Sequence, residues 1–92
     1  MSDFRIFETD QFQEDLRKIF GEREEKIAAK LRRYVYTQLR QQPYFGKNIK
    51  KLKGHAPETW RYRIGDHRFF YEIDDKKKTV FMIAAGLRAK NY

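Results

Sequence analysis

The sequence has 92 residues, no cysteine, and a formal net charge of +8 from 21 Lys and Arg against 13 Asp and Glu. This length suits one small domain with a single core, and the lack of Cys excludes a disulfide framework or a thiolate metal site. The longest apolar run, residues 80–85, is too short to span a membrane, and the N-terminus has no apolar stretch typical of a signal peptide. We therefore expect a single cytoplasmic domain, residues 1–92, with no membrane partner.

The positive charge is concentrated in the second half of the chain. Residues 1–46 contain nine Lys and Arg against eight Asp and Glu, whereas residues 47–92 contain twelve against five. A basic and aromatic-rich half of this kind indicates a polyanionic partner, and nucleic acid is favoured over a membrane because no lipid-facing amphipathic helix accompanies it.

The N-terminal half predicts a short strand followed by a pair of helices. Residues 4–7 form the strand, Thr9 or Asp10 caps the first helix, and Gly21 ends it. The apolar positions of this helix recur at helical spacing: Phe12, Leu16, Ile19 and Phe20.

The second helix begins in the acidic residues 22–25 and ends before Pro43. Its apolar stripe is Ile27, Leu31, then Tyr34 or Val35, and Leu39 or Gln38. The basic side chains mostly lie off this stripe, and we expect them to form a solvated face with pairs such as Glu22 with Lys26. They are Lys26, Lys30, Arg32, Arg33 and Arg40.

Residues 60–71 are rich in aromatic and β-branched residues and predict a β-hairpin. Gly65 and Asp66 divide this run, and Gly at the first central position suits a two-residue type II′ turn. Such a turn pairs Trp60 with Tyr71, Arg61 with Phe70, Tyr62 with Phe69, Arg63 with Arg68, and Ile64 with His67.

Because successive side chains alternate, these pairs fall on two faces of the sheet. One is a core face with Trp60, Tyr62, Ile64, Phe69 and Tyr71, and the other carries Arg61, Arg63, Arg68 and Phe70. Like charges opposite one another weaken a sheet, so the second face is either a site for an anion or a solvated face that happens to be basic. The hairpin alone does not decide between them.

Two further strands flank the hairpin. Residues 49–53 predict a short basic strand, and residues 79–85 are nearly all apolar and predict a central strand buried on both faces. The fold class is therefore α+β: an N-terminal strand, a two-helix hairpin, and a twisted, mainly antiparallel sheet of about four to five strands.

Several kinds of catalysis are excluded by the residue types. The two histidines, His55 and His67, are isolated, Ser2 is the only serine, and no glycine-rich phosphate loop is present, so we expect no metal or other cofactor. Arginine, lysine and tyrosine remain, and these suffice for phosphodiester chemistry. Arginines bind the phosphate and stabilise its developing charge, and a tyrosine near them has its phenolate favoured.

Residues 49–92 resemble the RelE/ParE superfamily of bacterial and archaeal toxins. The motifs that carry the resemblance are residues 51–54, 60–74 and 80–92, and it extends with lower specificity over nearly the whole chain. The resemblance implies a small basic toxin that forms a hetero-oligomer with a cognate antitoxin. Its RelE branch enters the ribosomal A site and cleaves mRNA without a metal, through attack of the RNA 2′-hydroxyl.

The resemblance also implies roles for particular residues. Arg61, Arg63 and Arg68 would clamp the phosphate, Arg88 would stabilise the transition state, and Tyr92 would be the base. Lysines of the second strand and the tail would add RNA contacts: Lys50, Lys51, Lys53 and Lys90.

Two other functions remain open. The ParE branch shares this fold but inhibits DNA gyrase by binding, and the presence of all five candidate catalytic residues favours the nuclease. The third hypothesis is a non-catalytic RNA-binding domain in which the aromatic side chains of the hairpin stack on bases. All of these aromatic residues except Phe70 fall on the expected core face.

Overall fold

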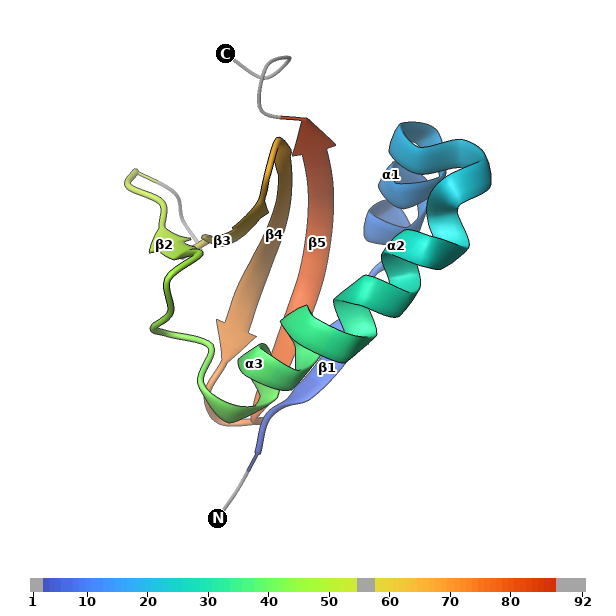
Figure 1. The fold of residues 1–92 in the computed structure, drawn as a ribbon. Helices are drawn as coiled ribbons and strands as arrows, with labels where there is room; N and C mark the ends of the chain where they lie inside the picture. The colour runs from blue at the N-terminus through green and yellow to red at the C-terminus, as the bar shows by residue number, and fades with distance from the viewer. Residues whose placement is uncertain (1–2, 55–57, 88–92) are drawn as a thin grey trace.

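The computed structural model describes residues 3–54 and 58–87, which form a five-stranded sheet with helices along one side (Figure 1). The strand order is β1-β5-β4-β3-β2, with β1 parallel to β5 and the other pairs antiparallel. The strands are β1 (Arg5–Glu8), β2 (Ile49–Lys51), β3 (Trp60–Ile64), β4 (His67–Asp74) and β5 (Thr79–Leu87). The expected α+β class with a mainly antiparallel sheet is confirmed.

Helix α1 (Asp10–Phe20) has the boundaries that its sequence predicts. The Thr9 hydroxyl accepts a hydrogen bond from the Phe12 backbone N–H at 3.2 Å, which satisfies one of the unpaired donors at the helix start. At the other end, Gly21 has a φ of +53°, a conformation that glycine adopts without the strain of a Cβ.

The second helical segment has three parts. After a 3₁₀ turn at Gly21–Arg23, it consists of α2 (Glu24–Lys30), a π-helical turn (Leu31–Val35) and α3 (Tyr36–Gln41). A π-helical turn widens the helix and shifts the phase of its faces. Val35 and Leu39 are fully buried, whereas Tyr34 is 59% exposed. Of the two alternatives at each position, the apolar stripe therefore contains Val35 and Leu39.

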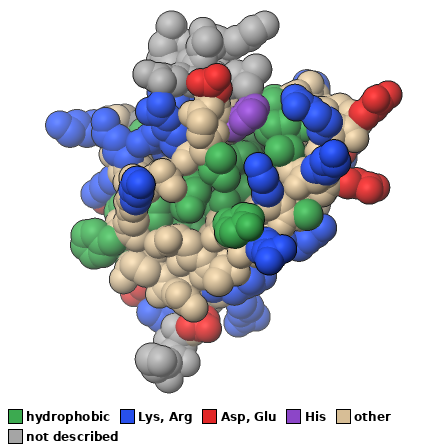
Figure 2. Space-filling view, viewed as in Figure 1, with side chains coloured by type: hydrophobic (Ala, Val, Ile, Leu, Met, Phe, Trp, Pro, Cys, Tyr) green, Lys and Arg blue, Asp and Glu red, His purple; other side chains and the backbone are tan. Residues whose placement is uncertain are grey.

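The core lies between the helices and one face of the sheet. Phe12 of α1 packs against Phe69 of β4 with ring centroids 6.3 Å apart. The buried Tyr71 hydroxyl donates to the Pro43 backbone carbonyl at 2.8 Å, which satisfies its polar group. Figure 2 shows hydrophobic side chains near the centre of the face in view, with Lys and Arg side chains around them.

The central hairpin has the predicted register at every pair, from Trp60 with Tyr71 to Ile64 with His67. Gly65 has a φ of +57°, and Lys78 is the only described residue other than glycine with a positive φ. A positive φ at Gly65 but not at Asp66 agrees with a type II′ turn.

The expectation that the last strand is buried on both faces is wrong. β5 does lie inside the sheet, between β1 and β4, but helices cover only the face that carries the fully buried Val80 and Met82. Phe81, on the opposite face, is partly exposed. We call this second side of the sheet, with no helix on it in the described chain, the open face.

The C-terminal part of β5 is held by α1. β1 ends where Glu8 pairs with Met82, and beyond this point the Ala85 backbone N–H donates to the Asp15 carboxylate at 3.0 Å. A side chain of the helix therefore satisfies a donor of β5 that no strand reaches.

None of the described helices has the length and apolar character needed to cross a membrane.

Candidate functional site

The three candidate arginines of the hairpin lie on the open face. Tyr62 between Arg61 and Arg63 is buried toward the helices, so the two arginine side chains project to the other side. Arg68 is the direct cross-strand partner of Arg63 and shares its face. All three residues are partly buried.

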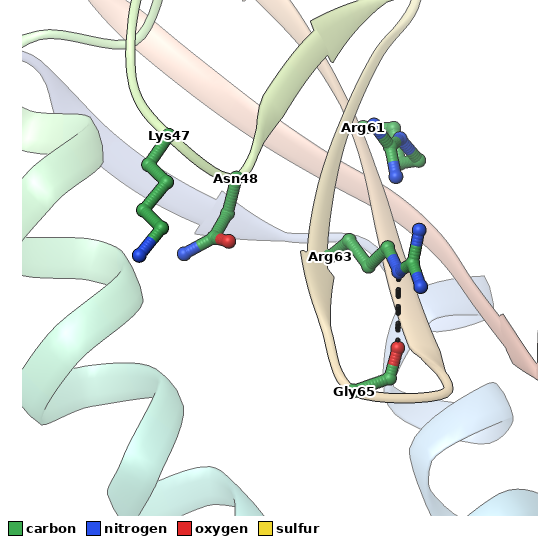
Figure 3. Close-up of a pocket in the computed structure, with 5 residues that line it drawn as sticks. All are labelled: Lys47, Asn48, Arg61, Arg63 and Gly65. Atoms are coloured by element: carbon green, nitrogen blue, oxygen red, sulfur yellow. Dashed lines mark hydrogen bonds between the residues drawn. The ribbon is translucent and has the colours of Figure 1, made fainter.

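Arg61 and Arg63 line one recess of about 310 Å³ together with Lys47, Asn48 and Gly65 (Figure 3). Lys47 and Asn48 come from the segment that leads into β2, and the two arginines come from β3. The recess therefore combines three cationic side chains, one amide and a turn carbonyl, a set that matches an anion with a polar group beside it.

Backbone and side-chain hydrogen bonds fix the geometry of this recess. The Arg63 backbone N–H donates to the Asn48 carbonyl at 3.0 Å, which continues the β2–β3 pairing by one residue. The Arg63 Nε donates to the Gly65 carbonyl at 3.1 Å, so the guanidinium is turned toward the hairpin turn (Figure 3). Arg68 does not line the recess and lies beside it on β4.

The lysines expected to bind RNA separate into two groups. Lys50 pairs with Arg61 and belongs to the open face. Lys51 pairs with Trp60, whose side chain packs toward the core, and its ammonium forms an ion pair with Glu58 at 2.8 Å. Lys53 is exposed in the turn after β2. The structure thus brings Lys50, but not Lys51, to the arginines.

The tail residues of the expected site, Arg88, Lys90 and Tyr92, lie outside the described residues. The described strand ends at Leu87, and its neighbour Gly86 pairs with Arg68. The described end of β5 therefore lies beside Arg68.

Two lining residues, Lys47 and Asn48, are not among the site residues expected from the sequence. Asn48 is two positions before Lys50, so the alternation of an extended strand was the available signal that both share a face. Lys47 precedes the strand, and only the path of the loop places it at the recess.

The two deeply buried tyrosines are structural groups. Burial raises the pKa of Tyr36 and Tyr71 above the ordinary tyrosine value, and a hydrogen bond to Glu8 raises that of Tyr36 further. Each is kept as the neutral phenol by the folded state. Neither has the lowered pKa that would favour a general base.

The described residues contain no group of three His, Asp or Glu side chains that could hold a metal ion. The charged groups that line the recess are cationic, and cations bind anionic oxygens instead of metal ions.

Solved structures with a similar fold come from toxin–antitoxin complexes. The toxin–antitoxin complex RelBE2 from Mycobacterium tuberculosis contains a similar chain, with 26% identity, a TM-score of 0.75, and coverage of 98% of this chain and 97% of that one. The RelE–RelB complex of Pyrococcus horikoshii gives 20% identity, a TM-score of 0.68, and coverage of 96% and 98%. The YoeB dimer from Staphylococcus aureus contains a similar chain, with 22% identity, a TM-score of 0.65, and coverage of 90% of this chain and 94% of that one.

A sequence model of the ParE toxin of the type II toxin–antitoxin system parDE matches residues 6–92. The chain therefore belongs to this toxin family, within the superfamily that its motifs resemble. No curated protein matches the sequence significantly.

Proposed function

We propose that this toxin is a ribosome-dependent mRNA endoribonuclease that needs no metal. The observation that carries the proposal is the shared recess of Arg61 and Arg63 on the open face, with Arg68 directly opposite Arg63. Guanidinium groups that lie close together bind the oxygens of a phosphodiester through charge-assisted hydrogen bonds.

In the proposed reaction, the 2′-hydroxyl of one nucleotide attacks its own 3′-phosphate. The phosphorus bond to the 5′-oxygen of the next nucleotide breaks, which leaves a 2′,3′-cyclic phosphate and a free 5′-hydroxyl. Arg61, Arg63 and Arg68 bind the phosphate, Arg88 stabilises the charge that develops on it, and Tyr92 accepts the proton of the attacking hydroxyl. The leaving oxygen takes a proton from water, because a guanidinium rarely gives one up.

The decisive experiment is single-turnover cleavage on ribosomes programmed with a defined mRNA, at saturating protein. We expect Tyr92→Phe to bind the ribosome normally and to cleave more slowly, because only the proton acceptor is lost. Arg88→Ala should reduce cleavage by roughly a hundredfold or more and affect binding less. A wild-type cleavage rate for Tyr92→Phe would contradict the proposed base.

The family match favours a second candidate, inhibition of DNA gyrase by binding, since the matching family model is that of ParE toxins. A supercoiling assay with purified gyrase separates the two functions. The nuclease proposal expects intact gyrase activity at toxin concentrations that cleave ribosome-bound mRNA. Gyrase inhibition without any mRNA cleavage would replace the first proposal with the second.

We also propose that a cognate antitoxin neutralises the toxin and covers the arginines of the open face. Similar chains occur in RelBE2 and RelE–RelB complexes, and a covered arginine set needs anionic partners because unpaired buried charge is costly. Expression of the toxin alone should arrest growth, and co-expression with the neighbouring open reading frame should restore it. Normal growth during expression of this protein alone would contradict the proposed toxic activity.

A further inference from the structure

Among the described residues, three large hydrophobic side chains are exposed to solvent: Phe7, Tyr34 and Phe45. Phe45 is the most exposed of the three, at 73%. Phe7 packs edge-on against Phe81 with ring centroids 5.7 Å apart, and the Arg33 guanidinium lies 5.7 Å from the centroid of the Tyr34 ring. The Phe45 ring makes neither kind of contact with a described residue. The packing of the domain therefore does not account for an aromatic ring at this position.

The loop that carries Phe45 is fixed on the N-terminal side of this residue. Tyr44 packs edge-on against Phe4 and Trp60, with ring centroids 6.1 and 5.5 Å apart. The Tyr44 hydroxyl also donates to the Asp75 carboxylate, in the turn between β4 and β5, at 3.1 Å. The residue before Phe45 is therefore held by aromatic packing and by a hydrogen bond.

The loop is fixed on the C-terminal side as well. The Gln38 side-chain amide of α3 donates to the Phe45 carbonyl at 3.0 Å, and the Ile49 N–H donates to the Gly46 carbonyl at 3.1 Å, which closes a turn. A Cβ at Gly46 would lie 3.0 Å from side-chain atoms of Gln38 and Ile49, so the chain passes close to both at this point. The backbone of Phe45 is thus held in place while its ring is exposed, and a group held in this way loses less entropy on binding.

Phe45 is close in the chain to the recess on the open face. Lys47 and Asn48, which line this recess, are the two central residues of the turn that begins at Gly46 (Figure 3). Two residues of extended chain span at most roughly 7 Å, so the Cα atoms of Phe45 and Lys47 lie within that distance of each other. The ring therefore extends from the segment that forms one wall of the recess.

A cationic recess with an exposed aromatic ring near it is typical of sites for single-stranded nucleic acid. The cations bind the phosphates, and the ring stacks on a base, because every base has a π-face. The recess supplies three cationic side chains, those of Lys47, Arg61 and Arg63, and Phe45 supplies the ring. An apolar surface of a protein partner could cover the ring too, but the neighbouring cations favour RNA.

We propose that the Phe45 ring stacks on a base of the mRNA, in a nucleotide adjacent to the phosphate bound by Arg61 and Arg63. The inference rests on the proposed function and adds to it a contact with a base, whereas the arginines bind phosphate. Stacking depends on the area of the π-face and not on a hydrogen-bond pattern, so this contact favours a purine at that nucleotide.

The test measures the affinity of the full-length toxin for ribosomes programmed with an mRNA that carries 2′-O-methyl groups on the A-site codon, which prevents the attack. Phe45→Ala should weaken binding by roughly tenfold, because a stacking contact is lost. Phe45→Leu retains an apolar side chain without a π-face and should lose as much, whereas Phe45→Trp should bind at least as tightly as the wild type. Wild-type affinity for Phe45→Ala or Phe45→Leu would overturn the proposal.

Tyr34→Ala is the matched control. It removes an aromatic ring that is 59% exposed from the helical segment, and Tyr34 does not line the recess. This variant should bind as the wild type does, and both alanine variants should keep the wild-type midpoint of urea denaturation because both rings are exposed. Equal losses of affinity in Phe45→Ala and Tyr34→Ala would overturn the site.

Abasic nucleotides identify the stacked base. A set of mRNAs, each lacking one base of the A-site codon or of a nucleotide beside it, is compared in binding to wild type and to Phe45→Ala. At one position the loss of the base and the loss of the ring should not add, because both remove the same contact. Additive losses at every position would show that the ring contacts another part of the ribosome, such as a protein surface, and would overturn the proposal.

Failure of the proposed function gives a different result. In that case unmodified mRNA stays intact with the wild-type toxin, and Arg61→Ala/Arg63→Ala binds programmed ribosomes as the wild type does; the inference then falls with the function. Failure of this inference alone leaves mRNA cleavage and the dependence on both arginines in place and removes only the effect of Phe45.

Discussion

The two faces of the sheet use the same strands for opposite purposes. On the helix side, Tyr71 and Phe69 are almost fully buried and make contacts that fix the domain. On the open face, the neighbouring residues Arg68 and Phe70 remain partly exposed, and cationic side chains lie beside one another. A single alternation of side chains thus separates the residues that stabilise the fold from those available to a partner.

The largest expected effect contrasts one phenylalanine from each side. Phe12→Ala should lower the free energy of unfolding by about 3–5 kcal/mol, because it leaves a cavity against Phe69. Phe7→Ala, at a side chain that is 54% exposed, should cost less than about 1 kcal/mol. Urea denaturation of both variants measures the difference. Equal losses would mean that the open face contributes to the core.

A second contrast concerns the arginines and affects binding instead of stability. Arg61→Ala/Arg63→Ala should weaken binding to programmed ribosomes by roughly a hundredfold and reduce the salt dependence, because in the proposed function each residue binds a phosphate that is already charged. The free energy of unfolding should change little. Binding measured over a range of salt concentrations, beside urea denaturation, separates the two effects. Unchanged affinity and unchanged salt slope would remove these arginines from the site.

A third prediction concerns alkaline pH and the helix side of the sheet. The pKa of Tyr71 is raised in the folded state by burial, so the folded protein retains this proton more strongly than the unfolded chain. The resulting stability is fully present below the unfolded pKa of about 10 and is lost as pH rises above it. The loss approaches about 1.4 kcal/mol per pH unit until the folded pKa is reached.

The Tyr71→Phe variant provides the control. It should be less stable near neutral pH by about 1–2 kcal/mol, because the Pro43 carbonyl loses its donor. Between pH 9 and 11 its stability should fall less steeply than that of the wild type. Parallel pH profiles from chemical denaturation would show that Tyr71 does not titrate with unfolding.

The smallest expected effect compares two adjacent lysines of β2. Lys50→Ala should weaken RNA binding a few-fold, because Lys50 lies opposite Arg61 on the open face. Lys51→Ala should leave RNA affinity nearly unchanged, because Lys51 lies on the other face and pairs with Glu58. Both variants lose one charge, so equal reductions would indicate attraction to the overall positive charge and not to one face.

The sequence by itself determined the local parts of this protein. Thr9 and Gly21 bound helix α1, and the turn at Gly65 and Asp66 set the complete register of the hairpin. From this register follow the two faces, with Tyr62 buried and Arg61 and Arg63 on the opposite side. These features depend on backbone conformation and on side-chain alternation, which residues close together in the chain specify.

Only the tertiary structure decided which surfaces are covered. The apolar run of β5 predicts burial on both faces, yet the helices of the described residues cover one face only, and no local pattern contains that information. Lys47 reaches the recess of Arg61 and Arg63 through the path of a loop. Arg40 lies beside the N-terminal end of the sheet because α3 packs against β1, where the Phe4 N–H donates to the Arg40 carbonyl. Contacts between residues far apart in sequence depend on packing of whole elements, and the sequence pattern of each element fixes only its own faces.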